Sequence, residues 1–211
     1  MCHSLVGSEM CIRDRPDIEE SRLFWYRLIT LIWAPIQFIT LFGILALAIS
    51  ADMTLLEKIG LFCAIGVLTG TIGINYAHEL MHKSGKLERW LADSLLAMVL
   101  YSHFRSEHLL VHHIHVGTPK DPVTARYNES FYSFFNRVLV QCPISAFKAE
   151  TQKLWRKRLP ASHISNPFYI YFSAQLFMIV LSILIGGFLG LFLFLIQAFV
   201  AVLLLELVNY I

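Results

Sequence analysis

Charged side chains are scarce in this sequence of 211 residues. Asp, Glu, Lys and Arg make up 15% of it, whereas soluble domains carry about 25%. Hydrophobic residues make up 56%, and the mean hydropathy is +0.61. The formal net charge of +2 is small, and no segment combines clustered Arg or Lys with aromatic residues, so nucleic acid is not an expected partner. The composition predicts a membrane protein.

Cysteine is also infrequent, and its spacing excludes two kinds of site. The four cysteines are Cys2, Cys11, Cys63 and Cys142. No CxxC pair occurs, so neither a zinc ribbon nor a disulfide framework is expected, and the cysteines are interpreted as reduced and structural. The sequence also lacks a flavin or haem motif, so any electrons that its chemistry requires would come from another protein.

Long apolar segments organise most of the chain, and each is long enough to cross about 30 Å of hydrocarbon. They cover residues 28–50, 55–77, 168–189 and 192–211, the last two separated around Gly186, Gly187 and Gly190. Residues 87–104 are apolar but too short for a full crossing, so we expect a re-entrant or partly inserted helix there. The sequence therefore predicts an all-α, polytopic membrane bundle with about four transmembrane helices.

The two ends of the sequence carry separate expectations. Residues 1–15 (MCHSLVGSEMCIRDR) lack the apolar core of a signal peptide and look like a non-native leader from sequence assembly, so His3 is set aside with them. Residues 16–27 are charged and amphipathic and fit a short interfacial segment. Residues 16–211 are interpreted as a fragment of a single membrane domain, whose sequence looks cut after Ile211.

Basic residues set the expected orientation. Residues 105–167 form a polar region with nine Lys or Arg side chains: Arg105, Lys120, Arg126, Arg137, Lys148, Lys153, Arg156, Lys157 and Arg158. Cytoplasmic loops of membrane proteins carry such an excess of Lys and Arg. This region, and the histidine clusters beside it, are therefore predicted to face the cytoplasm.

Seven of the nine histidines lie between His78 and Arg126. They are His78, His82, His103, His108, His112, His113 and His115. His78 and His82 are four residues apart, which places both imidazoles on one face of a helix. His108 and His112 repeat this spacing, and His113 adds a further nitrogen. Five histidines in two such clusters predict metal binding, with enough nitrogen for two ions.

Two other functions compete with this interpretation. Residues 78–82 (HELMH) match the HExxH motif of zinc proteases, with Glu79 as the general base. Such a protease needs two histidines and one further ligand, whereas three more histidines follow here, and the continuation HExxHxxGxxH is absent. A metal transporter is the non-enzymatic alternative, but its ligands are expected at mid-membrane. Imidazole binds Zn, Cu, Fe and Ni, so the spacing leaves the metal open.

Several polar residues near the histidines are candidates to orient them rather than to bind metal. They are Glu79, Glu107, His103, Asp121 and Glu206. Asp121 is also placed to pair with Arg126 and so to fix the loop after the second histidine cluster. Asp93 lies four residues from Arg89, which is the spacing of a helical ion pair.

Four segments, HELMHK, EHLLVHH, TPKDPVTAR and the terminal NYI, closely resemble those of the membrane-bound alkane 1-monooxygenases. That family belongs to the integral-membrane di-iron hydroxylases and desaturases. The resemblance runs from about Pro16 to Ile211, and TPKDPVTAR is its most specific part. Val111 stands where the family usually has Gly, which favours a divergent subgroup. The family has six transmembrane helices and a later histidine box, so this chain resembles an internal fragment.

The resemblance implies a specific chemistry. It implies two iron ions bound by His78, His82, His108, His112 and His113. It implies hydroxylation of the terminal carbon of medium-chain alkanes by O₂, with electrons from a rubredoxin and its NAD(P)H-dependent reductase, in the bacterial inner membrane. A fatty-acyl desaturase or hydroxylase and a xylene-type monooxygenase of the same superfamily remain as alternatives. Medium-chain alkanes dissolve in lipid, so membrane lipid is the expected surrounding of both protein and substrate.

Overall fold

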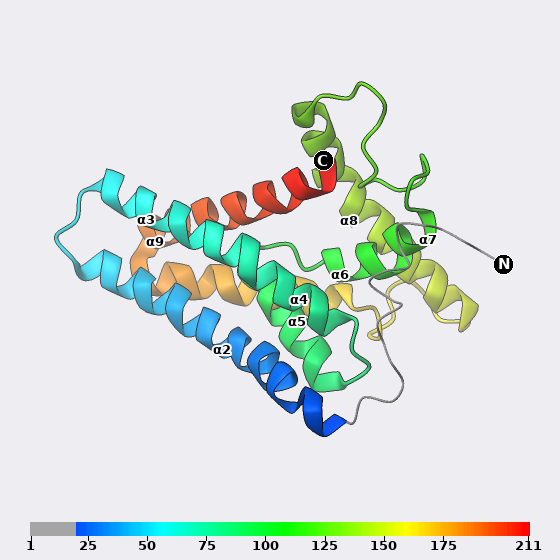
Figure 1. Cartoon of the computed structure of the whole chain (residues 1–211), viewed down its shortest axis with the longest axis horizontal. Coiled ribbons are helices and arrows are strands. Elements are labelled where there is room, and N and C mark those ends of the chain that lie inside the picture. The colour runs from blue at the N-terminus through cyan, green and yellow to red at the C-terminus, as the bar shows by residue number, and fades with distance from the viewer. Residues whose placement is uncertain (1–19) are drawn as a thin grey trace.

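The structure is a computed structural model that describes residues 20–211, and these residues form helices joined by turns and loops, without a β-strand (Figure 1). The predicted leader at residues 1–15 lies outside them. The helices are α2 (Glu20–Ser50), α3 (Leu55–Leu68), η1 (Thr69–Gly73), α4 (Ile74–Met81), α5 (Lys86–Met98), α6 (Phe104–Glu107), η2 (His108–His112), α7 (His113–His115), α8 (Phe131–Arg156) and α9 (Phe168–Tyr210), where η marks a π-helical turn. The predicted all-α class is confirmed for this part of the chain.

Three stretches are long and apolar enough to cross a membrane. They are Phe24–Ser50 in α2, Leu55–Met81 across α3, η1 and α4, and Phe168–Tyr210 in α9. The backbone of α9 is not helical at Gly186 and Gly187, and Gly187 has a φ of 60°, which glycine adopts without side-chain strain. Figure 1 shows two arms of α9 meeting at this bend and returning to the end from which α9 starts. The four predicted apolar segments are therefore present as three helices, the last one bent into two arms.

The first helix begins earlier than the sequence pattern indicates. α2 is continuous from Glu20 to Ser50, so from Glu20 onward the predicted interfacial segment belongs to the same helix as the first span. Pro35 lies inside this helix. A short turn at residues 51–54 follows α2. Thr54 and Glu57 then form a capping box at the start of α3, which satisfies backbone N–H groups that have no partner within the helix.

Small residues let α3 and η1 approach the second arm of α9 closely. A Cβ atom on Gly70 would lie 2.8 Å from Cα of Ala201, and one on Gly66 would lie 2.6 Å from Cβ of Val200. Helices in lipid gain their association from such close packing. Gly66 and Gly70 therefore serve the packing of these helices.

The short helix α5 is held among the longer helices by two buried amide side chains. Gln197 on α9 donates to the carbonyl of Met98 at 2.7 Å and accepts from the hydroxyl of Thr69 at 3.0 Å. Gln37 on α2 contacts the sulfur of Met98 at 3.7 Å. Hydrogen-bonding side chains at this depth join helices that would otherwise leave polar groups unpaired in lipid. They fix the end of α5, and the chain continues from there towards the second histidine cluster.

Helix α8 crosses the end of the molecule at which the histidines lie. Figure 1 shows α8 beside α6, α7 and the end of α9, whereas the turn at residues 51–54 and the bend of α9 lie at the opposite end. A second apolar cluster of Val123, Phe134, Val138 and Cys142 packs α8 against the loop at residues 116–130. The elements that carry the histidines are thus enclosed between the long helices and α8.

Candidate metal centre

Four imidazole rings meet where α4 ends and where η2 passes into α7. Nε2 of His78 lies 2.8 Å from Nε2 of His108 and 3.3 Å from Nε2 of His82. Nε2 of His108 also lies 2.9 Å from Nε2 of His113. His78, His82 and His108 each offer a nitrogen within 4.8 Å of the other two. The structure thus brings four of the five predicted ligands together, from two segments of the chain.

These separations suit nitrogen ligands around one metal ion. With a metal–nitrogen bond of about 2.1 Å, two ligand atoms lie about 3.0 Å apart at an angle of 90° and about 3.4 Å apart at the tetrahedral angle. The three Nε2–Nε2 distances of 2.8, 3.3 and 2.9 Å agree with this range to within a few tenths of an ångström. The donor set therefore fits a metal ion that binds imidazole.

The protonation of the rings agrees with metal binding. Burial, followed by the neighbouring rings of His78 and His113, lowers the pKa of His108 to about 2. Burial also lowers the pKa of His82 and of His113. These three rings are therefore neutral at pH 7, which is the form of imidazole that binds a metal.

A π-helical turn decides which histidine faces His108. At the end of η2 the backbone N–H of His113 donates to the carbonyl of His108, and such a bond spans five residues rather than the four of an α-helix. The ring centroids of His108 and His113 lie 4.5 Å apart. His112 instead lies 5.3 Å from His108 with its ring stacked on it. The pairing expected from the α-helical spacing, His108 with His112, is thus replaced by His108 with His113.

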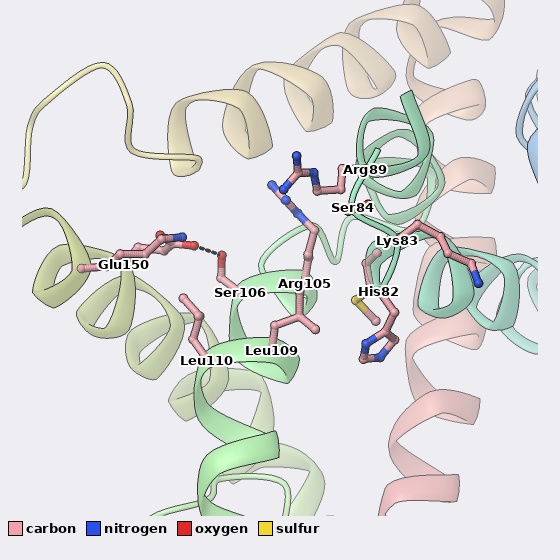
Figure 2. Close-up of a pocket in the computed structure, with 11 residues that line it drawn as sticks. His82, Lys83, Ser84, Arg89, Arg105, Ser106, Leu109, Leu110 and Glu150 are labelled. Atoms are coloured by element: carbon pink, nitrogen blue, oxygen red, sulfur yellow. Dashed lines mark hydrogen bonds and ion pairs between the residues drawn. The ribbon is translucent and has the colours of Figure 1, made fainter. Parts of the chain in front are cut away.

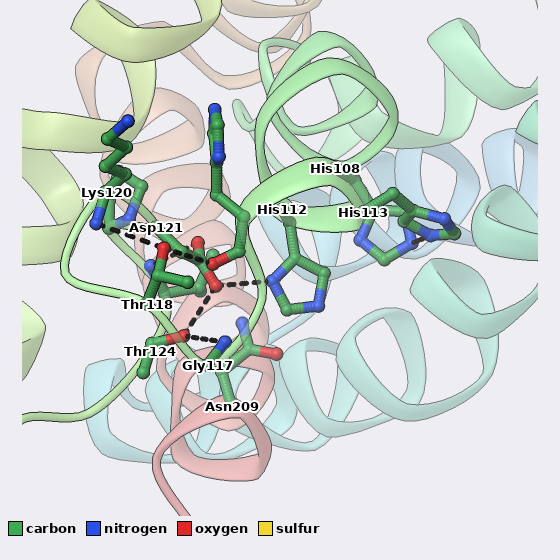
Figure 3. Close-up of polar contacts among 12 residues, drawn as sticks. His108, His112, His113, Gly117, Thr118, Lys120, Asp121, Thr124 and Asn209 are labelled. Carbon is green, nitrogen blue, oxygen red and sulfur yellow. Dashed lines mark hydrogen bonds and ion pairs between the residues drawn. The ribbon is translucent and has the colours of Figure 1, made fainter. Parts of the chain in front are cut away.

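His112 is held by a buried carboxylate (Figure 3). Its Nδ1 lies 2.9 Å from Oδ2 of Asp121, whose side chain is 0% exposed. Thr124 donates to the same oxygen at 2.7 Å, and Val123 N–H donates to Oδ1 at 3.0 Å. Burial raises the pKa of Asp121, but these hydrogen bonds outweigh it and keep the pKa below its usual value. An ionised carboxylate on Nδ1 leaves the lone pair of Nε2 for a metal.

The loop that carries Asp121 is fixed from α8 and not by Arg126. Arg137 donates to two loop carbonyls, among them that of Pro122, and it makes hydrogen bonds of 2.8 and 2.6 Å with Glu129. The backbone N–H of Arg126 donates to Glu129. Among the described residues no ion pair joins Asp121 to Arg126, so that prediction is wrong. Arg137, 16 positions along the chain from Asp121, takes the role instead.

Glu107 is a buried acid without a partner beside the cluster. It is 1% exposed, and neither of its carboxyl oxygens has a hydrogen-bond partner among the residues that the structure describes. Burial, followed by the charges of Asp121 and Glu206, raises the pKa of Glu107 to about 8. A cation bound nearby would favour the ionised form. These orphaned oxygens therefore also fit a cation at this place.

Two further candidates, Glu206 and His103, gather around Tyr101. The hydroxyl of Tyr101 donates to Glu206 at 2.7 Å, and Asn209 donates to the other oxygen of Glu206 at 3.1 Å. The ring of His103 packs against that of Tyr101 with centroids 4.3 Å apart, and burial lowers the pKa of His103 to about 4. Neither Glu206 nor His103 makes a hydrogen bond to one of the five candidate ligands in the described structure.

Glu79, the acid of the HExxH match, is directed to a lysine. Its carboxylate forms an ion pair with Lys83 at 2.7 Å, and both side chains are more than half exposed. No hydrogen bond joins Glu79 to a histidine among the described residues. This placement does not favour the general-base role that a zinc protease would require.

A polar pocket of about 330 Å³ opens beside His82 (Figure 2). The charged residues of its lining are Lys83, Arg89, Arg105, Glu150 and Lys153. Arg105 forms an ion pair with Asp93 at 2.7 Å, so the predicted partner of Asp93, Arg89, is wrong. The cause is that the chain turns after α5 and brings Arg105 back over it. Through this pocket the exposed ring of His82 is open to water.

Three residues that shape the site gave no signal in the sequence. They are Tyr101, Arg105 and Arg137, and their partners lie up to 105 positions away. Spacing identifies residues that share a face of one helix, whereas these contacts join different elements. In the sequence, only the hydroxyl and guanidinium groups themselves could have drawn attention to them.

Comparison with known proteins places this geometry in a family. Residues 58–211 match the family model described as fatty acid desaturase. The chain is 40% identical over 157 residues to alkane 1-monooxygenase 2 of Alcanivorax borkumensis, which covers 74% of this chain and 41% of that protein. It is 35% identical over 193 residues to alkane 1-monooxygenase 1 of Pseudomonas aeruginosa, covering 89% and 49%.

A relative with another substrate matches more weakly. The hydroxylase component of the xylene/toluene monooxygenase of Pseudomonas putida is 32% identical over 133 residues, which cover 63% of this chain and 36% of that protein. The chain thus spans between about a third and a half of the length of these curated relatives. The resemblance drawn from HELMHK, EHLLVHH and TPKDPVTAR is confirmed by these matches.

Proposed function

Because the chain belongs to the fatty acid desaturase family, we propose that it forms part of a membrane di-iron hydroxylase that acts on alkanes. The observation that carries the proposal is the convergence of His78, His82 and His108 within 4.8 Å of one another, with Nε2 of His113 2.9 Å from that of His108. The names of the relatives supply the substrate class, since seven of the eight matching proteins are alkane 1-monooxygenases.

The candidate ligands divide between two ions. His78, His82 and His108 would hold one iron, and His113, together with His112 oriented by Asp121, would contribute to the second. Two irons bound there would supply the activation of O₂ for hydroxylation. The protein's own residues hold the rings neutral, fix the tautomer of His112 and surround the site with apolar side chains. The buried ring of Phe104 lies 5.2 Å from that of His108 and shields it from water on that side.

The preferred reaction is hydroxylation of the terminal carbon of a medium-chain alkane to a primary alcohol. Such a substrate partitions into lipid and can reach a site at the end of apolar helices from the bilayer. Electrons would come from a rubredoxin and its NAD(P)H-dependent reductase. The family description favours a second candidate, a fatty-acyl desaturase or hydroxylase. The exposed Glu79–Lys83 ion pair disfavours the zinc protease.

We place the histidines at the cytoplasmic face of the bacterial inner membrane. The polar region with nine Lys and Arg side chains, residues 105–167, lies at the histidine end of the bundle (Figure 1). The turn at residues 51–54 and the bend at Gly186–Gly187 lie at the opposite end, where Lys58 is the only basic residue near them in the sequence. This asymmetry is the one that the positive-inside tendency describes.

Metal and product analysis of the intact protein tests the proposal. We expect about two irons per chain and, with O₂ and an electron donor, 1-octanol from octane. One zinc without iron would refute the di-iron centre. Iron with a desaturated or hydroxylated acyl product, and no octanol, would support the second candidate instead.

A further inference from the structure

The side chains at every fourth position of helix α8 are buried against the rest of the protein. Six of its seven buried residues recur at this spacing, namely Phe134, Val138, Cys142, Ala146, Glu150 and Leu154, and the seventh is Thr151. This stripe covers the loop at residues 116–130, α6 and the end of α9. Figure 1 shows α8 running across the ends of the long helices rather than alongside them. α8 is not among the helices apolar enough to span a membrane.

The two flanks of the buried stripe differ in chemistry. On one flank, Arg137 contacts the loop that holds Asp121, Gln141 is exposed and Lys153 lines the pocket beside His82. On the other flank, Phe135 and Phe147 are aromatic. One side of α8 therefore faces the polar surroundings of the histidines, while the other side is apolar.

The apolar flank continues the surface of the membrane-crossing helix α9. The ring of Phe135 lies 6.1 Å from that of Phe199, and the ring of Phe147 lies 5.1 Å from that of Phe168. Phe199 lies within the third candidate span and is itself 56% exposed. One arm of α9 thus meets each end of the apolar flank, which places that flank at the membrane side of α8.

Exposed aliphatic side chains lie between these two contacts. Leu139 is 37%, Val140 60% and Ile144 47% exposed, and no described residue covers them. Basic residues follow at the end of the helix, among them Lys148 and Arg156. An amphipathic helix with an apolar side and basic residues is typical of one that lies in the membrane–water interface, with its apolar side about 5–10 Å into the headgroup and acyl boundary.

We propose that α8 lies in the membrane interface, with Leu139, Val140 and Ile144 in contact with bilayer lipid. Continuity with α9 is the reason to assign these side chains to lipid rather than to a protein partner. Trp155, 63% exposed, marks the headgroup level, where tryptophan is enriched. The metal centre, which lies beside α8, is then close to the bilayer surface. This inference is independent of the reaction proposed for the site.

Site-specific quenching in the intact protein tests this placement. Single cysteines at Val140 and Ile144, in a background whose native cysteines are replaced by alanine, are labelled with bimane and reconstituted into vesicles. Gln141→Cys is the matched control, one position away and about 100° around the helix. A cooperative thermal unfolding transition first shows that each variant is folded. Fluorescence quenching by lipids brominated near the glycerol end of the acyl chain is then compared with quenching by aqueous iodide.

The two aliphatic positions should respond in the opposite way to the control. We expect bromolipid to quench the labels at Val140 and Ile144 severalfold more strongly than the label at Gln141, and iodide to show the reverse order. Strong iodide quenching at all three positions would mean that α8 faces water and would overturn the inference. Protection of Val140 and Ile144 from both quenchers would equally overturn it, since a protein segment would then cover them.

Discussion

Replacing Asp121 by asparagine should empty part of the metal centre without unfolding the protein. Oδ2 of Asp121 accepts hydrogen bonds from Nδ1 of His112 at 2.9 Å and from the hydroxyl of Thr124 at 2.7 Å. In Asp121→Asn an amide oxygen can still accept from Val123 N–H, but an NH₂ group then faces both donors. His112 loses its acceptor, and its ring is free to turn or to change tautomer.

The size of the effect follows from the hydrogen bond that is lost. A hydrogen bond to a charged group contributes about 1.5–3 kcal/mol, and each 1.4 kcal/mol is about a factor of ten in a binding constant. We therefore expect the affinity of the ion that His112 holds to fall by about 10–100-fold. Loss of a carboxylate that orients a histidine ligand costs about the same factor in other metal proteins.

Iron retention measures this directly. Wild type and Asp121→Asn are dialysed against a graded series of a chelator, and iron per chain is determined by mass spectrometry. Thr124→Val is the control, because it removes a neighbouring hydrogen bond to the same oxygen but leaves the pair of His112 and Asp121. The reasoning is refuted if Asp121→Asn retains iron like wild type, or if Thr124→Val loses as much.

Three further outcomes are expected. His108→Ala removes the nitrogen that lies between those of the other rings and should retain less than a tenth of the iron, whereas His115→Ala should retain it, as metal analysis will show. A Cβ on Gly70 would lie 2.8 Å from the backbone of α9, so Gly70→Ala should lower the melting temperature in detergent. Gly43→Ala, with nothing within 4 Å, should not. Hydrogen bonds from the guanidinium of Arg137 lower the pKa of Glu129 to about 2. The ionised Glu129 therefore stabilises the fold above about pH 4.5, and this stabilisation is lost as the pH falls towards 2. Glu129→Gln should lack this part of the acid dependence of the melting temperature.

Hydropathy alone predicted the long helices because membrane spans are limited by composition more than by sequence detail. A backbone in lipid must pair its own N–H and C=O groups, so an apolar run of sufficient length has few alternatives to a helix. The bend at Gly186–Gly187 was also visible, because glycine pairs interrupt such runs. The boundary at residue 28 was wrong since charge does not end a helix: Arg27 on the extended α2 forms an ion pair with Glu88 of α5.

The ligand types could be predicted from the sequence, whereas their partners could not. Several imidazoles at helical spacing indicate a metal centre, whichever of them finally face one another. The choice of Arg105 for Asp93 and of Arg137 for the loop depends on how separate helices cross. Such contacts follow no sequence periodicity. Arg126 was therefore predicted to pair with Asp121 only because it has the opposite charge and lies nearby in the sequence, and this prediction was wrong.

A π turn in each of the two histidine-bearing segments explains why the rings converge. A π turn holds about one residue more than an α turn, so it rotates everything that follows by about 100° relative to an uninterrupted helix. In the second span η1 separates α3, whose Gly66 packs on α9, from α4, which carries His78. The packing face and the ligand face are therefore set separately along one helix. In η2 the π turn likewise places the ring of His113 against that of His108, whereas His112 makes its hydrogen bond with Asp121. The backbone register thus determines the centre as much as the number of histidines does, and the α-helical spacing from which the site was predicted could not reveal it.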